Sequence, residues 1–208
     1  ENYSGKFFGP TRLRYALTKS RNLVSIRLLQ QMGIGHALDH IARFGFDPDE
    51  LPGNLSLALG SGVVTPLQMA RGYAVLANGG FLVDPYFIER IEDPYQGPVF
   101  HANPLRACRD CEAEERQQTE GPPAPGSWLP APRAISPQNW YLMNSMMQDV
   151  ITGGTAQRAR ALGRRDLAGK TGTTNEQRDA WFSGFNADIV ATAWAWFESH
   201  PDGYESRA

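Results

Sequence analysis

The sequence is poor in the features that would assign it to several common classes of protein. Its 208 residues include only two cysteines, and 20 basic side chains stand against 22 acidic ones, giving a formal net charge of −2. This balance creates no overall basic field, so the composition favours neither nucleic acid nor an anionic lipid surface as a partner. The longest apolar run, residues 189–197, is much shorter than the roughly 18 residues of a membrane-spanning helix. We therefore expect no segment of this sequence to span a membrane.

The two cysteines, Cys108 and Cys111, are separated by two residues. This spacing fits a small disulfide, half of a metal site or a redox pair. A zinc site would need two more ligands, and none of the four histidines has finger-like spacing. No strand–helix–strand pattern surrounds the pair, as a thioredoxin-like motif would require. The spacing favours a structural disulfide or two idle thiols, and we predict no metal and no cofactor.

The order of the predicted elements indicates an α+β fold in one domain over residues 1–208. Apolar periodicity and flanking start and stop signals predict helices over residues 11–19, 23–32, 34–44, 65–78 and 136–150. Aromatic and β-branched residues around a proline at 81–91 suit a hairpin or an edge strand. Three successive strands are predicted at 166–170, 180–185 and 189–197. Runs of helices followed by runs of strands are typical of a sheet covered by helices.

Residues 101–135 differ in composition from the rest of the chain. They contain several glutamates, and these are followed by five prolines within residues 122–132. A segment of this kind has little apolar surface to bury. We therefore predict a surface insertion that is partly disordered.

The segment Lys170–Thr173, Lys-Thr-Gly-Thr, is the most informative about chemistry. A phosphate-binding loop would need a glycine five positions before Gly169, where Arg164 stands instead. Such a loop must also open a helix, whereas a glycine, two threonines and an asparagine complete this segment. The residues fit the end of an edge strand better. There, Lys170 supplies a cation, and Gly172 allows the backbone of a ligand to approach closely.

A second motif, Ser-Arg-Asn, occupies residues 20–22. Taken alone, Ser20 and Asn22 could simply be helix-capping residues. Together with Lys-Thr-Gly, however, a Ser-x-Asn triplet belongs to the motif set of serine β-lactamases and penicillin-binding proteins. The remaining member of that set is absent, because no serine is followed three places later by a lysine. The chain thus carries two of the three motifs.

Stretches that are typical of one protein family occur along nearly the whole chain, at residues 2–10, 16–22, 58–67, 73–80, 136–139, 151–155 and 170–175. They resemble the class A bifunctional penicillin-binding proteins of Gram-negative bacteria, in particular those of the 1A type. The resemblance implies a penicillin-binding protein/serine β-lactamase-like transpeptidase fold, in which helices cover an antiparallel sheet. Ser20 and Asn22 would then face Lys170–Thr173 across a cleft. Trp196 departs from the pattern, because the family usually has a glycine there.

The resemblance implies a reaction and a role for each motif residue. In this family a serine attacks a D-alanine carbonyl of a peptidoglycan stem peptide, and the acyl group passes to an amine of a second stem. Ser20 would relay a proton to the leaving group, Asn22 would bind the substrate amide, and Lys170 would stabilise anionic charge. The backbone N–H of Thr173 would form half of the oxyanion hole. The hydroxyls of Thr171 and Thr173 would bind the terminal carboxylate.

The resemblance also implies β-lactam antibiotics as ligands and a periplasmic location. The membrane anchor, a glycosyltransferase domain and the nucleophilic serine would all lie in a preceding part of a longer protein. We therefore expect the isolated chain to form no stable adduct with penicillin. In an oxidising compartment, Cys108 and Cys111 would form a disulfide. Two alternatives stay open: a β-lactamase-type hydrolase, in which Glu176 could supply the deacylating carboxylate, and a non-catalytic penicillin-binding sensor or scaffold.

Overall fold

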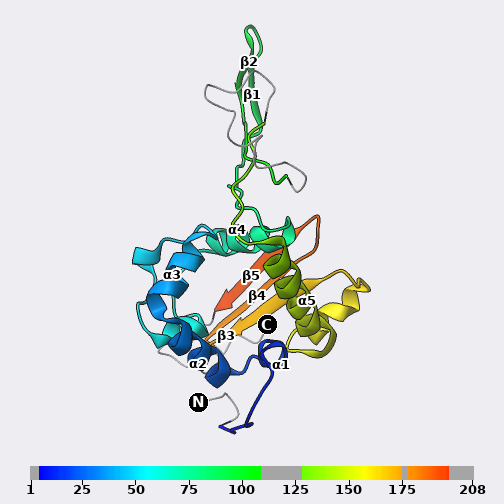
Figure 1. The fold of residues 1–208 in the computed structure, drawn as a ribbon. Helices are drawn as coiled ribbons and strands as arrows, with labels where there is room; N and C mark the ends of the chain where they lie inside the picture. Colours follow the sequence, from blue (N-terminus) through cyan, green and yellow to red (C-terminus); the bar gives the residue numbers. More distant parts are fainter. Residues whose placement is uncertain (1–4, 109–127, 175–177, 197–208) are drawn as a thin grey trace, which may run out of the picture.

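The computed structural model describes residues 5–108, 128–174 and 178–196 of the chain. In Figure 1, helices surround a small sheet, and a two-stranded hairpin projects away from this body. The order of helices followed by antiparallel strands agrees with the predicted α+β class.

Five α-helices form the helical part of the described chain: α1 (Leu13–Thr18), α2 (Asn22–Met32), α3 (Ile34–Ala42), α4 (Pro66–Ala77) and α5 (Pro137–Gly153). The first and last residues of each helix lie within three positions of the predicted bounds. Short 3-10 turns follow at η1 (Pro48–Glu50), η2 (Leu55–Leu59) and η3 (Gln157–Leu162). The start signals act as expected, because the Thr65 hydroxyl accepts from the Gln68 N–H at 3.1 Å and the Ser136 hydroxyl accepts from the Asn139 N–H at 3.3 Å.

The sheet of the body has the order β3–β4–β5, with β3 (Ala168–Thr173), β4 (Asp179–Phe185) and β5 (Val190–Trp196) all antiparallel. The Lys-Thr-Gly-Thr segment forms most of β3. Among the described strands, β3 lies at an edge of this sheet, as predicted. Lys170 pairs with Ser183, and Gly172 pairs with Trp181. One edge of β3 is thus fixed by β4, while its other edge pairs with no described strand.

The projecting hairpin consists of β1 (Arg90–Asp93) and β2 (Gly97–His101). The prediction placed a hairpin or edge strand at residues 81–91, which is too early in the chain. Phe81 instead packs into the core with 1% of its surface exposed. The turn of the hairpin is formed by the Asp93 carboxylate, which accepts from the backbone N–H groups of Tyr95 and Gln96 at 2.8 and 2.9 Å.

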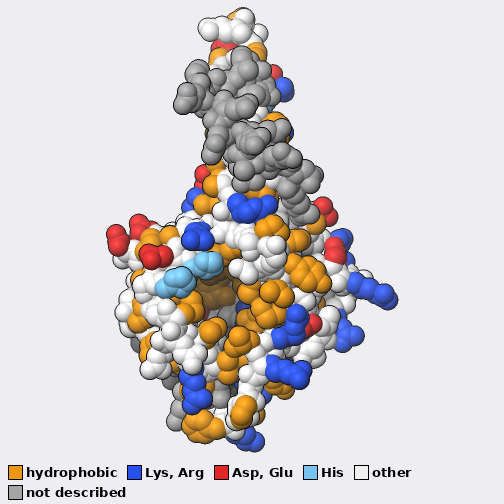
Figure 2. Space-filling view, viewed as in Figure 1, with side chains coloured by type: hydrophobic (Ala, Val, Ile, Leu, Met, Phe, Trp, Pro, Cys, Tyr) orange, Lys and Arg blue, Asp and Glu red, His pale blue; other side chains and the backbone are white. Residues whose placement is uncertain are grey.

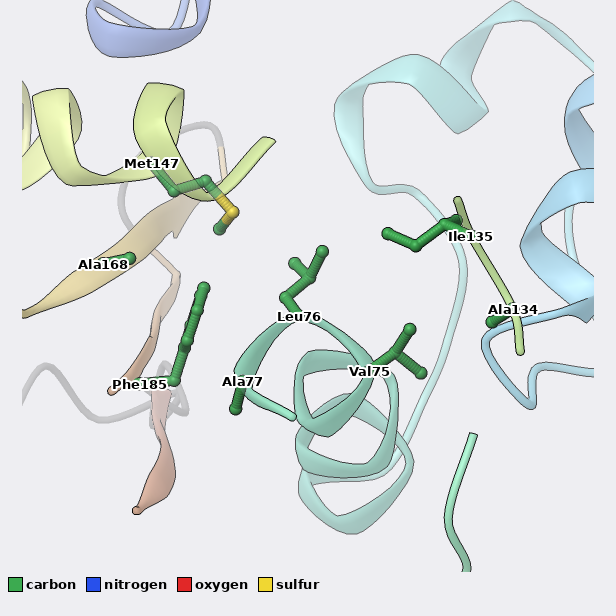
Figure 3. Packing of buried hydrophobic residues seen from close by; sticks show 8 residues of the cluster. All are labelled: Val75, Leu76, Ala77, Ala134, Ile135, Met147, Ala168 and Phe185. Atoms are coloured by element: carbon green, nitrogen blue, oxygen red, sulfur yellow. The ribbon is translucent and has the colours of Figure 1, made fainter. Parts of the chain in front are cut away.

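The main core lies between α4, α5 and the sheet (Figure 3). In Figure 3, Leu76 and Ala77 of α4 lie on the side of Met147 of α5 and Phe185 of β4, whereas Val75 points toward Ala134 and Ile135. Removing such side chains from water is the main favourable contribution to folding. The same contacts fix β3, and therefore Lys170–Thr173, relative to the helices.

The prediction of a surface insertion at residues 101–135 is wrong for its last residues. Ala131, Ala134 and Ile135 are 1%, 5% and 6% exposed. Their backbone returns to the segment that follows α4, where the Leu82 N–H donates to the Pro132 carbonyl at 2.9 Å. Proline-rich composition did not prevent burial because the small side chains around these prolines fit against the core. Residues 109–127, the middle of the predicted insertion, lie outside the described residues.

Only one of the two cysteines, Cys108, lies within the described residues. Cys108 is disulfide-bonded in the structure. The other cysteine of the chain, Cys111, lies outside the described residues.

Candidate active site

Ser20 lies in the short connection between α1 and α2. Its φ of 52° is in the left-handed region, which is uncommon for a residue with a side chain. The Ser20 N–H donates to the Leu17 carbonyl at 3.1 Å, and the Arg21 N–H donates to the Ala16 carbonyl at 2.8 Å. These bonds fix the unusual backbone. Residues with sparsely populated backbone angles cluster at functional sites, which directs attention to the Ser20 side chain.

The Ser20 side chain faces the sheet and does not cap α2. The N-cap residue of α2 is Arg21, whose side chain makes no capping hydrogen bond, and Asn22 is already the first residue of the helix. The Ser20 hydroxyl instead accepts a hydrogen bond from the Lys170 ammonium of β3. The capping interpretation of Ser20 and Asn22 is therefore wrong, and the two motifs meet across a cleft.

Lys170 is the most strongly perturbed group of the cleft. Its Nζ donates to the Ser20 hydroxyl and also to the Thr171 carbonyl oxygen at 2.8 Å. Burial lowers the pKa of Lys170 from 10.5 to about 8, because desolvation disfavours the charged form. The ammonium is thus still the main form at neutral pH, but its proton is much easier to remove than that of an exposed lysine. Such a group can both stabilise an anion and exchange a proton with Ser20.

The other residues of the motif lie along β3 and differ in their surroundings. The Thr171 hydroxyl is 2.6 Å from the hydroxyl of Thr155. A Cβ placed on Gly172 would lie 3.2 Å from the Cβ of Trp181, so a larger residue would crowd the strand at this point. Thr173 is the last residue of β3 and is exposed. Within four residues, β3 thus carries the Lys170 cation, the side-chain-free backbone of Gly172 and the hydroxyl of the exposed Thr173.

Lys170 contacts both Ser20 and the Thr171 carbonyl directly. The positions of Asn22 and Thr173 come from the elements that carry them, since Asn22 begins α2 and Thr173 ends β3. The residues predicted for the site therefore lie in two segments, one formed by the α1–α2 connection and the first residue of α2, the other by β3.

A hollow adjoins Lys170 on the side of the helices, and Figure 2 shows hydrophobic side chains around it. It has a volume of about 230 Å³, and it is lined by Leu17, Phe44, Phe46, Met69, Gly72, Tyr73, Leu76, Met143, Met147 and Lys170. Burial beside this space raises the pKa of Tyr73 to about 12. The apolar lining explains the lowered pKa of Lys170, because little water or polar surface solvates its ammonium.

The sequence analysis included residues 151–155, at and after the end of α5, in the family resemblance but assigned them no role in the site. The Lys19 ammonium donates to the Gly153 carbonyl at 2.7 Å, and the Thr155 N–H donates to the Thr18 carbonyl at 3.3 Å. This loop therefore lies against the connection that carries Ser20. The available sequence signal was a pair of glycines followed by a threonine at the end of a long helix, which usually means only a helix stop.

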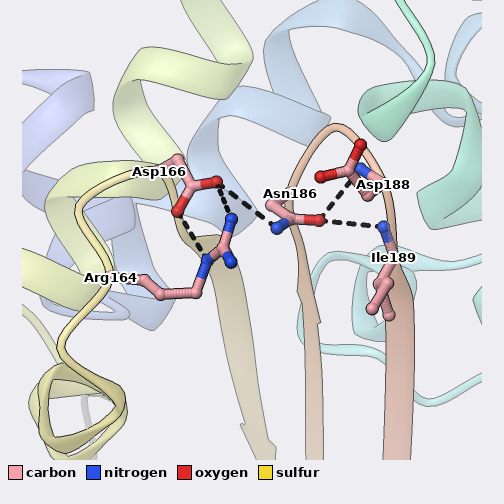
Figure 4. Close-up of polar contacts among 5 residues, drawn as sticks. All are labelled: Arg164, Asp166, Asn186, Asp188 and Ile189. Atoms are coloured by element: carbon pink, nitrogen blue, oxygen red, sulfur yellow. Dashed lines mark hydrogen bonds and ion pairs between the residues drawn. The ribbon is translucent and has the colours of Figure 1, made fainter.

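The start of β3 is anchored by a polar cluster away from the motif (Figure 4). The Arg164 guanidinium makes two hydrogen bonds to the Asp166 carboxylate at 2.6 and 2.9 Å, and they lower the pKa of Asp166. Asn186 donates to Asp166 at 3.3 Å and accepts from the backbone N–H groups of Asp188 and Ile189 at 2.9 and 2.8 Å. This cluster joins the entry to β3 with the turn between β4 and β5.

Two features that a site of another kind would need are missing from the described part of the chain. In residues 5–108, 128–174 and 178–196, no three side chains of His, Cys, Asp or Glu gather as metal ligands would. In the same ranges, no helix has the length and apolarity required to cross a membrane.

Comparisons with known proteins agree on one family. The model of the penicillin binding protein transpeptidase domain matches residues 2–202. Penicillin-binding protein 1A of Pseudomonas aeruginosa is 45% identical to this chain over 223 residues, which cover 95% of the chain and 27% of that protein. For penicillin-binding protein 1A of Vibrio cholerae, the identity is 40% over 212 residues, covering 96% of the chain and 25% of that protein.

A solved structure gives the same result. The crystal structure of penicillin-binding protein 1A from Haemophilus influenzae superimposes with a TM-score of 0.83 at 38% identity, covering 96% of this chain and 32% of the other. The chain therefore belongs to the penicillin-binding protein transpeptidase family. It spans about a quarter of the length of the curated relatives that it matches.

Proposed function

We propose that this chain carries the second and third active-site motifs of a peptidoglycan DD-transpeptidase that is also a target of β-lactams. The contact between Lys170 and Ser20 is the observation that supports the proposal most strongly. It brings together two motifs that are 150 residues apart in the sequence. A lysine whose pKa is about 8, in contact with a hydroxyl, is suited to moving a proton near neutral pH.

The roles of the residues follow from their chemistry. Ser20 passes a proton to the leaving group, and Lys170 supplies that proton and stabilises the anionic substrate. The Thr171 and Thr173 hydroxyls bind the carboxylate of the stem peptide or of the β-lactam. The N–H of Thr173 contributes to the oxyanion hole, and Asn22 binds the amide of the donor peptide.

The nucleophile has to come from outside this sequence, which contains no Ser-x-x-Lys. We place the segment that carries it against the apolar hollow beside Lys170, because a helix with an apolar face would fill that space. A nucleophilic serine there would lie next to both Lys170 and Ser20. This serine would give up its proton as it attacks the D-alanine carbonyl of the donor stem, and the terminal D-alanine would leave with the proton that Ser20 passes to it. The amine of a second stem would then take the acyl group, and the serine would regain a proton.

The proposal extends to the longer protein. Its location is the periplasm, it is held at the inner membrane by an anchor outside this chain, and it carries a glycosyltransferase domain. The family membership and the similarity to 1A-type proteins support this arrangement. The hydrolase alternative stays a prediction of the sequence, and its acid, Glu176, lies outside the described residues.

The test is covalent labelling by a fluorescent penicillin. We expect the 208-residue chain to remain unlabelled and the longer protein to be labelled at a serine outside this chain. Lys170→Met in the longer protein should reduce the rate of labelling by roughly 10²-fold or more, because a proton-transfer group is lost. Arg90→Met, which removes a cation from the projecting hairpin, serves as the control and should label at the wild-type rate.

Two results would contradict the proposal. One is labelling of the isolated chain, because its residues would then include a nucleophile. The other is a longer protein that stays unlabelled although it is folded, which would favour a scaffold. Slow release of the bound penicillin is expected of a transpeptidase, whereas rapid turnover would favour the hydrolase.

A further inference from the structure

The loop Gly153–Thr155 lies between the two sides of the cleft. On the Ser20 side, it accepts a hydrogen bond from Lys19 at 2.7 Å and donates one to the Thr18 carbonyl at 3.3 Å. Gly154 packs directly on the Thr18 carbonyl, where a Cβ would clash with backbone atoms. Thr18 and Lys19, the two residues before Ser20, thus bind the α1–α2 connection to the loop.

The same loop reaches the other side of the cleft through one side chain. The Thr155 hydroxyl is 2.6 Å from the Thr171 hydroxyl of β3. Thr171 is the residue after Lys170, and its carbonyl accepts from the Lys170 ammonium at 2.8 Å. A continuous set of contacts therefore runs from the Ser20 connection through Thr155 to the Lys-Thr-Gly-Thr strand.

The loop is attached to a rigid base. Val150 and Ile151 in the last turns of α5 are 0% and 3% exposed. The Ala156 N–H, just after the loop, donates back to the Val150 carbonyl at 3.1 Å. Earlier on α5, Asp149 pairs with Arg14 of α1 at 2.9 Å. The position of Thr155 is accordingly set by the core.

The geometry points to Thr155 as a positioning residue that orients the Thr171 hydroxyl. A hydroxyl has one proton, so Thr171 can donate to a ligand only if it does not donate to Thr155. When Thr155 donates to Thr171, the Thr171 proton is directed to the cleft, where a carboxylate accepts it. This inference rests on the proposed function, in which Thr171 binds the carboxylate of the substrate.

A purely structural role would give a different outcome. Thr155 is exposed and Thr171 is half-buried, so water can replace much of their hydrogen bond, and its loss should cost little stability. The effect of losing it should therefore appear in the recognition of a carboxylate and leave unfolding almost unchanged.

The experiment uses the longer penicillin-binding protein and compares a penicillin with its methyl ester. Thr155→Val keeps the shape of the side chain but removes the hydroxyl, and Thr155→Ser restores the hydroxyl. We expect Thr155→Val to lower the second-order acylation rate by about tenfold for the free acid, since a hydrogen bond to a charged group is weakened. The rate for the ester should change less than about twofold, and Thr155→Ser should recover the rate for the acid.

Two controls isolate the contact. Thr152→Val changes an exposed threonine at the end of the same helix and should leave both rates unchanged. In a Thr171→Val background, Thr155→Val should have no further effect on the acid, because the two substitutions remove the same interaction. Thermal unfolding of each variant verifies that the protein is folded.

The outcomes separate this inference from the function on which it rests. If the wild-type protein acylates and Thr155→Val slows acid and ester equally, or slows neither, the positioning role is wrong and the transpeptidase assignment stands. Additive losses in the Thr171→Val background overturn the positioning role in the same way. A folded wild-type protein that does not acylate overturns the proposed function, and the positioning role with it.

Discussion

The two antiparallel sheets formed by the described residues have similar backbones and very different surroundings. Strands β3–β5 pack against α4 and α5, and Phe185 of β4 is 3% exposed. Strands β1 and β2 pair only with each other in the described residues, and Phe100 of β2 is 46% exposed. Strand pairing alone therefore does not position a site. The Lys-Thr-Gly-Thr segment lies on the sheet that the core fixes.

The comparison extends to charged groups. Lys170 of β3 is largely removed from water, and its pKa is lowered for that reason. Arg90 and Glu92 of β1 form an ion pair at 3.2 Å in which both side chains are more than half exposed. Exposed pairs of this kind contribute little to stability because solvent and salt screen them. Of these charged groups, Lys170 is the one that the fold removes from water, and this desolvation is what shifts its pKa.

The largest expected difference between the two sheets is in the cost of removing an aromatic side chain. Phe185→Ala leaves a cavity between β4 and Tyr73 of α4, so we expect a loss of about 3–5 kcal/mol in the free energy of unfolding. Phe100→Ala on the hairpin should cost less than about 1 kcal/mol. Urea unfolding of the 208-residue chain measures both. Equal losses would mean that the hairpin packs on the body in solution.

A smaller difference is expected from adding one methyl group to a glycine. A Cβ on Gly169 of β3 would lie 2.8 Å from the Ser183 carbonyl oxygen and 3.0 Å from the Gly184 Cα, so the backbone of β4 must move. We expect Gly169→Ala to destabilise the chain by roughly 1–3 kcal/mol.

Gly97, which begins β2 of the hairpin, provides the matched control for Gly169. A methyl group on Gly97 would meet no atom within 4 Å, but the φ of this residue is +79°. Its substitution by alanine is therefore limited by backbone conformation and not by space. Gly97→Asn, which tolerates left-handed angles, should be milder than Gly97→Ala. Thermal unfolding of the three variants tests this, and a mild Gly169→Ala would show that β3 is not tightly packed on β4.

The smallest expected effect is the pH dependence that Lys170 gives to stability. Its pKa is about 8 in the folded chain and 10.5 without burial, so between these values the unfolded chain binds more protons. The free energy of unfolding should therefore rise with pH from about 8 to 10.5, by on the order of 1–2 kcal/mol after solvent screening. Below pH 8 the cost of the buried cation is fully present.

Subtracting the profile of a variant isolates this contribution. Lys170→Met should lack the rise, whereas Val99→Thr, on the exposed hairpin, should keep the wild-type profile. Urea unfolding at several pH values measures the difference. A rise that persists in Lys170→Met would assign it to another group.

Much of the fold could be predicted because its signals are local. Thr65-Pro66 and Ser136-Pro137 begin helices through contacts within three residues. The hairpin was misplaced because residues 81–91 and 90–101 have similar aromatic and β-branched composition, and only packing decides that Phe81 is buried while the later residues project.

The residue types of the candidate site were predictable, and the family resemblance also placed Ser20 opposite Lys170, but the individual hydrogen bonds were not predictable. Ser20 and Lys170 came from motif spacing and family resemblance, because no local pattern relates residues 150 positions apart. Thr155 lies in the stretch 151–155 that contributes to the family resemblance, but the sequence gave it no role, since a threonine after a helix-ending glycine pair is ordinary. Its contact with Thr171 exists only because α5 and β3 pack together.

The sequence by itself determined where most helices and strands form, which residues are candidates for the site, and that it contains no Ser-x-x-Lys motif. The tertiary structure decided which of those residues meet, which sheet is fixed by the core, and how acidic the Lys170 ammonium is. The physical reason is that helix caps and strand patterns act over a few neighbouring residues. Desolvation and contact across a cleft depend on segments that only packing brings together.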